Sequence, residues 1–189
     1  MLRLNLEDFP TVHSVTYLNS ASISLMPKPA IESMVEFQRK IASEGTISFD
    51  EEAETQVLES ARNEAASLFG AHREEVAVLS SATAGICSFA WSLDLKRGAN
   101  IVSTDADFPS VVYPWMRLGQ EKGVEVRLAK NHDGVVNEYE LEKLVDDRTA
   151  VISISHVEYG TGQRFDLGWL SNLAHSHGAL LIVDETQSA

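Results

Sequence analysis

The sequence has little of several features that define common protein classes. A single cysteine, Cys87, in 189 residues excludes an internal disulfide framework and a zinc site built from several cysteines. No apolar run approaches the roughly 20 residues needed to cross a bilayer. Residues 1–10 lack the basic-then-apolar order of a signal peptide. We therefore expect a cytoplasmic protein with no membrane association.

Basic side chains are also scarce. Fifteen Lys and Arg residues face 28 Asp and Glu residues, which gives a formal net charge of −13. Because phosphate contacts need a basic patch, nucleic acid is an unfavourable partner. His175 and His177 lie two residues apart on an expected helix, so their side chains diverge and we expect no metal site. A small-molecule ligand is the expected partner.

Familiar glycine-rich motifs are missing as well. The sequence has no Walker loop, no "GxGxxG" after its first expected strand and no "GxSxG" elbow. These absences argue against a P-loop enzyme, a dinucleotide-binding domain and an α/β-hydrolase.

The first half of the sequence predicts two helices after an irregular start that ends near Pro29. The second of them is expected over 50–69, with Gly70 as its C-terminal cap. The residues expected to face inward on the first helix are Ile31, Met34, Val35, Gln38 and Ile41. Those expected to face inward on the second helix are Ala53, Val57, Leu58, Ala61, Ala65 and Leu68.

The rest of the chain alternates between strand and helix patterns. Strands are expected at 76–79, 100–104, 124–129, 150–155 and 179–183, and helices at 84–93, 110–123, 137–145 and 166–178. Such alternation predicts an α/β fold with a mostly parallel sheet and helices on both faces. Ligands of such folds bind at the C-terminal ends of the strands, so we expect a ligand site among the residues that follow each strand.

Three of these strand ends carry suggestive residues. In "SSATAG", Ser81 and Thr83 precede a helix whose free N–H groups can bind an anion, although ordinary helix capping is the simpler interpretation. Phe108 follows a strand and can lie against a flat ring, or it can be a core residue under a loop. Its neighbours Asp105 and Asp107 are expected to be solvated loop charges.

Asp184 ends an apolar strand, and a carboxylate there needs a cation or strong donors. A protonated ring nitrogen is such a partner, and Gln187 offers a donor and an acceptor to the same region. A phosphate cradle, a ring-stacking aromatic and an acid for a ring nitrogen together describe pyridoxal 5′-phosphate.

At these residues the chain resembles the class V aminotransferase and cysteine desulfurase family of fold type I. "YLNSAS" (17–22) resembles the family's "YLDxAA", "SSAT" its "SGAT", "SHVEYGTG" its "SHVxNxxG", and "VDETQS" its "VDxxQS". The resemblance implies an N-terminal arm over 1–30 and part of the pyridoxal-phosphate-binding large domain over 31–189. That domain has a seven-stranded sheet, which would be incomplete at the C-terminus.

The resemblance also implies roles for individual residues. Ala82 and Thr83 would hold the phosphate, Phe108 would stack on the pyridine, Asp184 would bind the ring nitrogen and Gln187 would contact the ring hydroxyl. Tyr159 stands where desulfurases often have Asn, and Phe108 stands where they usually have His. These departures favour an aminotransferase-like, epimerase-like or lyase-like member that acts on an amino acid.

One expected residue is absent. By the resemblance, the Schiff-base lysine would follow beyond residue 189, as would the C-terminal domain. We therefore expect this chain to be inactive alone and the intact enzyme to be a homodimer. The alternative is a non-catalytic α/β domain that binds phosphate or a cofactor.

Overall fold

The computed structural model describes residues 5–47 and 49–188. The chain divides into two compact units, Met1–Val78 and Leu79–Ala189, which are described separately. No helix among the described residues is long and apolar enough to span a bilayer. The arm and domain boundary expected near residue 30 stays a prediction.

The first unit is helical. Its elements are the 3₁₀ helices η1 (Leu6–Asp8), η2 (Pro10–His13), η3 (Gly45–Ile47) and η4 (Arg73–Glu75), and the α-helices α1 (Lys28–Glu44) and α2 (Glu51–Phe69). The carboxylate of Asp50 caps α2 by accepting a hydrogen bond from the Ala53 N–H at 3.0 Å. Gly70 ends the helix at φ +65°, a left-handed conformation that glycine adopts without strain. Both ends of α2 therefore lie where the sequence predicted them.

The inward faces predicted for α1 and α2 are wrong. Met34 is 56% exposed and Val57 is 59% exposed, and Ala66 is the one buried residue on the two helices. The periodicity of a helix specifies an apolar stripe but not the element that covers it. Within the described part of this unit, no sheet is present to cover these stripes.

The second unit contains a four-stranded parallel sheet in the order β2-β1-β5-β6. Its strands are β1 (Asn100–Thr104), β2 (Glu125–Ala129), β5 (Thr149–Ser155) and β6 (Leu180–Asp184). Its helices are α3 (Ala82–Ser92), α4 (Pro109–Lys122), α5 (Glu138–Glu142) and α6 (Leu167–Ser176).

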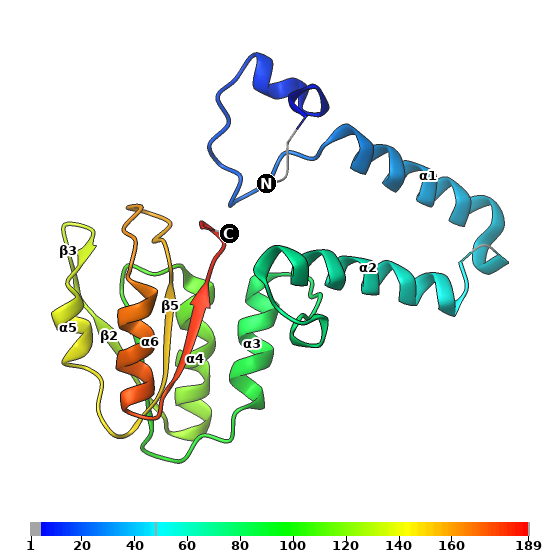
Figure 1. The fold of residues 1–189 in the computed structure, drawn as a ribbon. Helices are drawn as coiled ribbons and strands as arrows, with labels where there is room; N and C mark the ends of the chain where they lie inside the picture. Colours follow the sequence, from blue (N-terminus) through cyan, green and yellow to red (C-terminus); the bar gives the residue numbers. More distant parts are fainter. Residues whose placement is uncertain (1–4, 48, 189) are drawn as a thin grey trace. The chain divides into compact units, whose positions relative to one another are not determined.

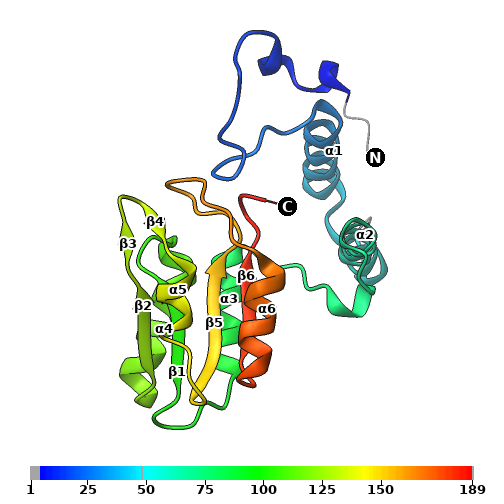
Figure 2. The same ribbon diagram turned by 60° about the vertical axis from the view of Figure 1, so that its left-hand side comes forward.

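Two apolar clusters lie on opposite faces of this sheet (Figures 1 and 2). Val102 and Ile152 pack with residues of α5 and α6, whereas Ile101 and Val151 pack with residues of α3 and α4. Successive strand residues point to opposite faces, so both faces are covered by helices. The predicted fold class is confirmed.

Two local predictions differ from the structure. Residues 76–79 form no strand and are mostly exposed, because this segment pairs with no neighbouring strand among the described residues. A short antiparallel hairpin, β3 (Asn131–His132) and β4 (Val135–Val136), was not predicted. Its turn is formed by Asp133 and Gly134, both at positive φ, and the Asp-Gly pair was the available signal.

Candidate cofactor site

The carboxyl ends of β1, β5 and β6 lie side by side at one edge of the sheet. Ser155 and Asp184 are register partners on adjacent strands there. Ile182, two residues before Asp184, packs into the cluster formed with α3 and α4. Since side chains alternate along a strand, Asp184 faces the same side of the sheet as those two helices.

The first turn of α3 lies at this same edge. The loop 93–99 joins the end of α3 to the start of β1, so the helix runs back along the strands and begins at their carboxyl ends (Figure 1). The Ser81 Oγ accepts a hydrogen bond from the Ala84 N–H at 3.1 Å, which confirms the capping interpretation for this serine. Ala82 and Thr83 are exposed in the first turn, where backbone N–H groups have no partner within the helix.

Phe108 forms an aromatic pair with Tyr159. Their ring centroids are 5.1 Å apart and their planes meet at 84°, an edge-to-face arrangement. Phe108 directly precedes α4 and is 46% exposed, and Tyr159 follows β5 and is 54% exposed. Phe108 is therefore not a core residue under its loop, and part of its ring remains accessible to a ligand.

Asp184 is half-buried, and its Oδ1 accepts a hydrogen bond from the Thr186 N–H at 2.8 Å. This is the one hydrogen bond to its carboxylate within the described residues. Gln187 lies in the turn that follows β6 and is exposed. Ser188 is the last described residue, and Ala189 lies outside the described residues.

Asp107 corrects the expectation of a solvated loop charge. It is 8% exposed, and its carboxylate accepts hydrogen bonds from the Ser155 Oγ at 2.6 Å, the Ser155 N–H at 2.9 Å and the Phe108 N–H at 2.8 Å. Burial raises the pKa of Asp107 and the nearby charge of Asp184 raises it further, while the donors oppose both effects. Asp107 therefore ties the end of β1 to the end of β5. Asp105 is exposed, and its carboxylate accepts a hydrogen bond from the Asn131 backbone N–H at 2.7 Å and pairs with Lys130 at 3.2 Å.

Glu158 was not singled out from the sequence. It is 1% exposed, and its Oε1 accepts a hydrogen bond from the Thr104 Oγ at 3.1 Å. Burial, together with the charge of Asp107, raises the pKa of Glu158 to about 7. The only sequence signal was its place between a buried strand and Tyr159, and an acid in a loop is usually solvated.

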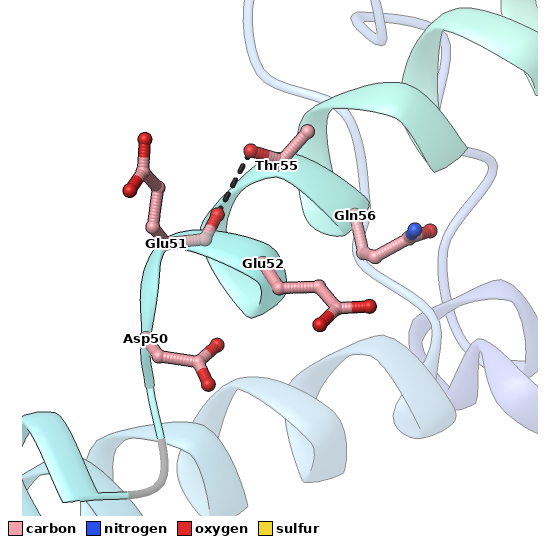
Figure 3. A pocket seen from close by; sticks show the side chains of 5 residues that line it. All are labelled: Asp50, Glu51, Glu52, Thr55 and Gln56. Carbon is pink, nitrogen blue, oxygen red and sulfur yellow. Dashed lines mark hydrogen bonds between the residues drawn. The ribbon is translucent and has the colours of Figure 1, made fainter.

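A second group of acids lies at the start of α2 (Figure 3). Asp50, Glu51 and Glu52 line a hollow there, and the Glu51 carboxylate points away from the other two (Figure 3). Acids in the first turn of a helix complement its dipole. No cluster of His, Cys, Asp or Glu residues suited to a metal ion occurs within residues 5–47 and 49–188.

The groups at the strand ends suit a phosphorylated pyridine. Free N–H groups and the Thr83 hydroxyl in the first turn of α3 suit a phosphate. The exposed part of the Phe108 ring suits an aromatic ring, and the Asp184 carboxylate suits a protonated ring nitrogen. Asp184 and the first turns of α3 and α4, the second of which follows Phe108, lie at the carboxyl ends of the strands and on the α3–α4 side of the sheet.

Known proteins share this arrangement of elements. The profile of the family described as Aminotransferase class-V matches residues 16–189. A probable cysteine desulfurase from Methanothermobacter thermautotrophicus is 30% identical over 96% of this chain and 46% of its own length. An uncharacterized aminotransferase of Bacillus subtilis, YcbU, is 32% identical over 96% of this chain and 47% of its own length. The chain thus spans about half the length of the curated relatives it matches.

Solved structures agree at the level of the fold. A variant of C-DES, with glycine covalently linked to its pyridoxal phosphate cofactor, gives a TM-score of 0.86 at 21% identity. The match covers 99% of this chain and 51% of the C-DES chain. The cysteine desulfurase CsdA from Escherichia coli gives a TM-score of 0.79 at 25% identity, covering 95% and 47%. Pyridoxal phosphate, the cofactor predicted from the sequence, is the cofactor of this family. With a profile match over nearly its whole length, the chain belongs to the class V aminotransferase family.

Proposed function

We propose that this chain supplies the cofactor-binding half of a pyridoxal-phosphate-dependent enzyme that acts on an amino acid. The observation that supports the proposal is that Asp184 and the first turns of α3 and α4, the second directly preceded by Phe108, lie at the carboxyl ends of the strands and on one face of the sheet. When bound, pyridoxal phosphate supplies an electron sink for the bonds at the amino acid's α-carbon.

Each residue has a separate task in this proposal. The N–H groups of Ala82 and Thr83, with the Thr83 hydroxyl, bind the phosphate. Phe108 covers one face of the ring, and Asp184 keeps the ring nitrogen protonated. Tyr159 and Gln187 donate hydrogen bonds toward the ring oxygen. Asp107 holds Phe108 in place through the Phe108 N–H.

The residues also bear on the reaction type. Phe108 has no proton to give or take, so proton transfers must be made by another group. This supports transamination, epimerisation or a lyase reaction over typical desulfuration. The relatives carry names of several of these kinds, including an aminotransferase, cysteine desulfurases and a structure of the cystine C-S lyase C-DES with cysteine persulfide.

We further propose that this chain binds the cofactor without covalent attachment and turns over no amino acid by itself. Among the described residues, Lys130 is the lysine that directly follows a strand of the sheet, and it is paired with Asp105 at 3.2 Å. The complete enzyme would place its attachment lysine in the remaining half, and we propose that it is a homodimer. Turnover by this chain alone, after addition of pyridoxal phosphate and an amino acid, would contradict this proposal.

The cofactor role is tested by titrating the chain with pyridoxal phosphate and, separately, with pyridoxal, while following tryptophan fluorescence. We expect saturable binding that is much weaker for pyridoxal, since pyridoxal lacks the phosphate. Thr83→Ala should weaken binding of pyridoxal phosphate by about tenfold, the effect of losing one hydrogen bond to a charged group. Ser92→Ala, which removes a hydroxyl at the other end of α3, is the matched control. Equal affinity for the two compounds would exclude the phosphate cradle.

A further inference from the structure

Glu158 is an acid enclosed by the protein with half of its carboxyl group unused. It is 1% exposed, and its Oε1 accepts a hydrogen bond from the Thr104 Oγ at 3.1 Å. Its Oε2 is buried and has no hydrogen-bond partner among the described residues. An ionised carboxylate with an unpartnered buried oxygen is costly, whereas a neutral carboxylic acid is tolerated.

A second buried carboxyl acts on Glu158. The charge of Asp107 raises the pKa of Glu158, in addition to the effect of burial. Ionising two neighbouring buried carboxyl groups at once is unfavourable, because their negative charges repel each other. Asp107 accepts hydrogen bonds from three donors, and Glu158 accepts one. Asp107 is therefore the member that carries the charge, and Glu158 is the member that keeps the proton.

The two acids also support the two aromatic residues of the site. Asp107 accepts the Phe108 N–H at 2.8 Å and so fixes the entry into α4. The backbone of Glu158 closes the turn that carries Tyr159: its N–H donates to the Gln163 carbonyl at 2.9 Å and its carbonyl accepts from the Gly162 N–H at 2.9 Å. Phe108 and Tyr159 then meet edge to face.

We propose that Glu158 is a positioning residue, which works as a neutral carboxylic acid with its proton on Oε2 and keeps Phe108 and Tyr159 in contact. Ionisation of Glu158 beside charged Asp107 drives the two segments apart and disturbs the ring face offered to the cofactor. The part that concerns the cofactor rests on the proposed function.

The surrounding charges are consistent with this assignment. Asp184, on β6, acts on Asp107 and adds negative charge to the group. His156 is engaged by the Glu185 carboxylate at 3.0 Å. Among the described residues, no cation forms an ion pair with Glu158 or Asp107.

The test is a pH titration of the chain from about 5 to about 9, which extends about two units on either side of the Glu158 pKa of about 7. Carbon NMR of labelled glutamate reports the protonation of Glu158, assigned by its loss in Glu158→Gln. Proton NMR of the Tyr159 ring reports its contact with Phe108. We expect Glu158 to titrate with a midpoint near pH 7. The chemical shift of the Tyr159 ring should change with the same midpoint in the wild type and stay constant in Glu158→Gln. Asp107→Asn should lower the midpoint by about one unit or more, because it removes the neighbouring charge.

Binding of pyridoxal phosphate is measured over the same range. As the pH rises, the affinity for pyridoxal phosphate should fall by about tenfold more in the wild type than in Glu158→Gln. Ionisation of the cofactor itself affects both proteins equally and does not contribute to this difference. A Glu158 midpoint near that of an ordinary glutamate, or a Tyr159 shift with the same pH dependence in Glu158→Gln, would overturn the proposal. Absence of cofactor binding with both NMR results as expected would contradict the proposed function and leave the positioning of the aromatic pair supported.

Discussion

At the scale of single residues, acids of similar appearance in the sequence have different roles because of the donors around them. Asp107 is buried and meets three donors, whereas Glu158 is buried and meets one. Asp184 is half-buried at the end of an apolar strand. The sequence predicted a special role for Asp184 alone, because only its apolar strand signals burial. The burial of Asp107 depends on β5, about fifty residues further along the chain, which local patterns do not reveal.

Glu158 should make the stability of the chain depend on pH. Its pKa is raised from an ordinary 4.5 to about 7 in the folded state, so the folded state binds the proton more tightly. Stability is therefore greatest below pH 4.5 as far as this group is concerned, falls as the pH rises to about 7 and then stays low. At pH 8, Glu158→Gln should raise the free energy of unfolding by roughly 2 kcal/mol.

Urea unfolding of the wild type and Glu158→Gln at several pH values measures this difference. The gain should shrink as the pH falls and vanish only below pH 4.5, where Glu158 is protonated in both the folded and the unfolded state. A gain of the same size at all pH values would show that the substitution acts through packing and not through the proton.

Asp107→Ala should destabilise the chain by about 2–3 kcal/mol, because the Ser155 and Phe108 N–H groups lose their acceptor. Asp147→Ala is a suitable control, since Asp147 is exposed. Unfolding by urea at pH 7 gives both values. Equal, small effects of the two substitutions would contradict the role given to Asp107.

At the scale of elements, close approach of α4 to β2 depends on Gly119. A Cβ at this position would lie 2.7 Å from the carbonyl oxygen of Val124, which is part of the backbone and cannot move aside easily. Gly119→Ala should therefore destabilise the chain by about 1–3 kcal/mol, although alanine favours a helix interior by about 1 kcal/mol. Thermal or urea unfolding measures the change. Gly160→Ala, where a Cβ would meet nothing within 4 Å, is the control and should have little effect.

The elements themselves were mostly predictable. Helix α2 was predicted to within a residue because Asp50 and Gly70 are strong capping residues. Strands β1, β5 and β6 were predicted because they are short apolar runs. Residues 76–79 share that apolar character but form no strand, because a strand also needs a neighbour to pair with, and periodicity does not reveal one.

At the scale of the whole chain, burial is unevenly distributed. Helix α1 has no buried residue, whereas six of the seven residues of β5 are buried. Amide hydrogen exchange should therefore be fast in α1 and slowest in β5, because protection follows local stability. Exchange followed by mass spectrometry tests this expectation. Equal protection of Lys28–Glu44 and Thr149–Ser155 would mean that another surface covers α1 in solution.

The central claim is that the carboxyl edge of the sheet binds pyridoxal phosphate with its ring nitrogen at Asp184. Nitrogen NMR of the chain with ring-¹⁵N-labelled pyridoxal phosphate, at pH 8, tests it most directly. We expect a protonated ring nitrogen in the wild type and in the control Asp147→Ala, and an unprotonated one in Asp184→Ala. A ring nitrogen in the same protonation state in the wild type and in Asp184→Ala would contradict it.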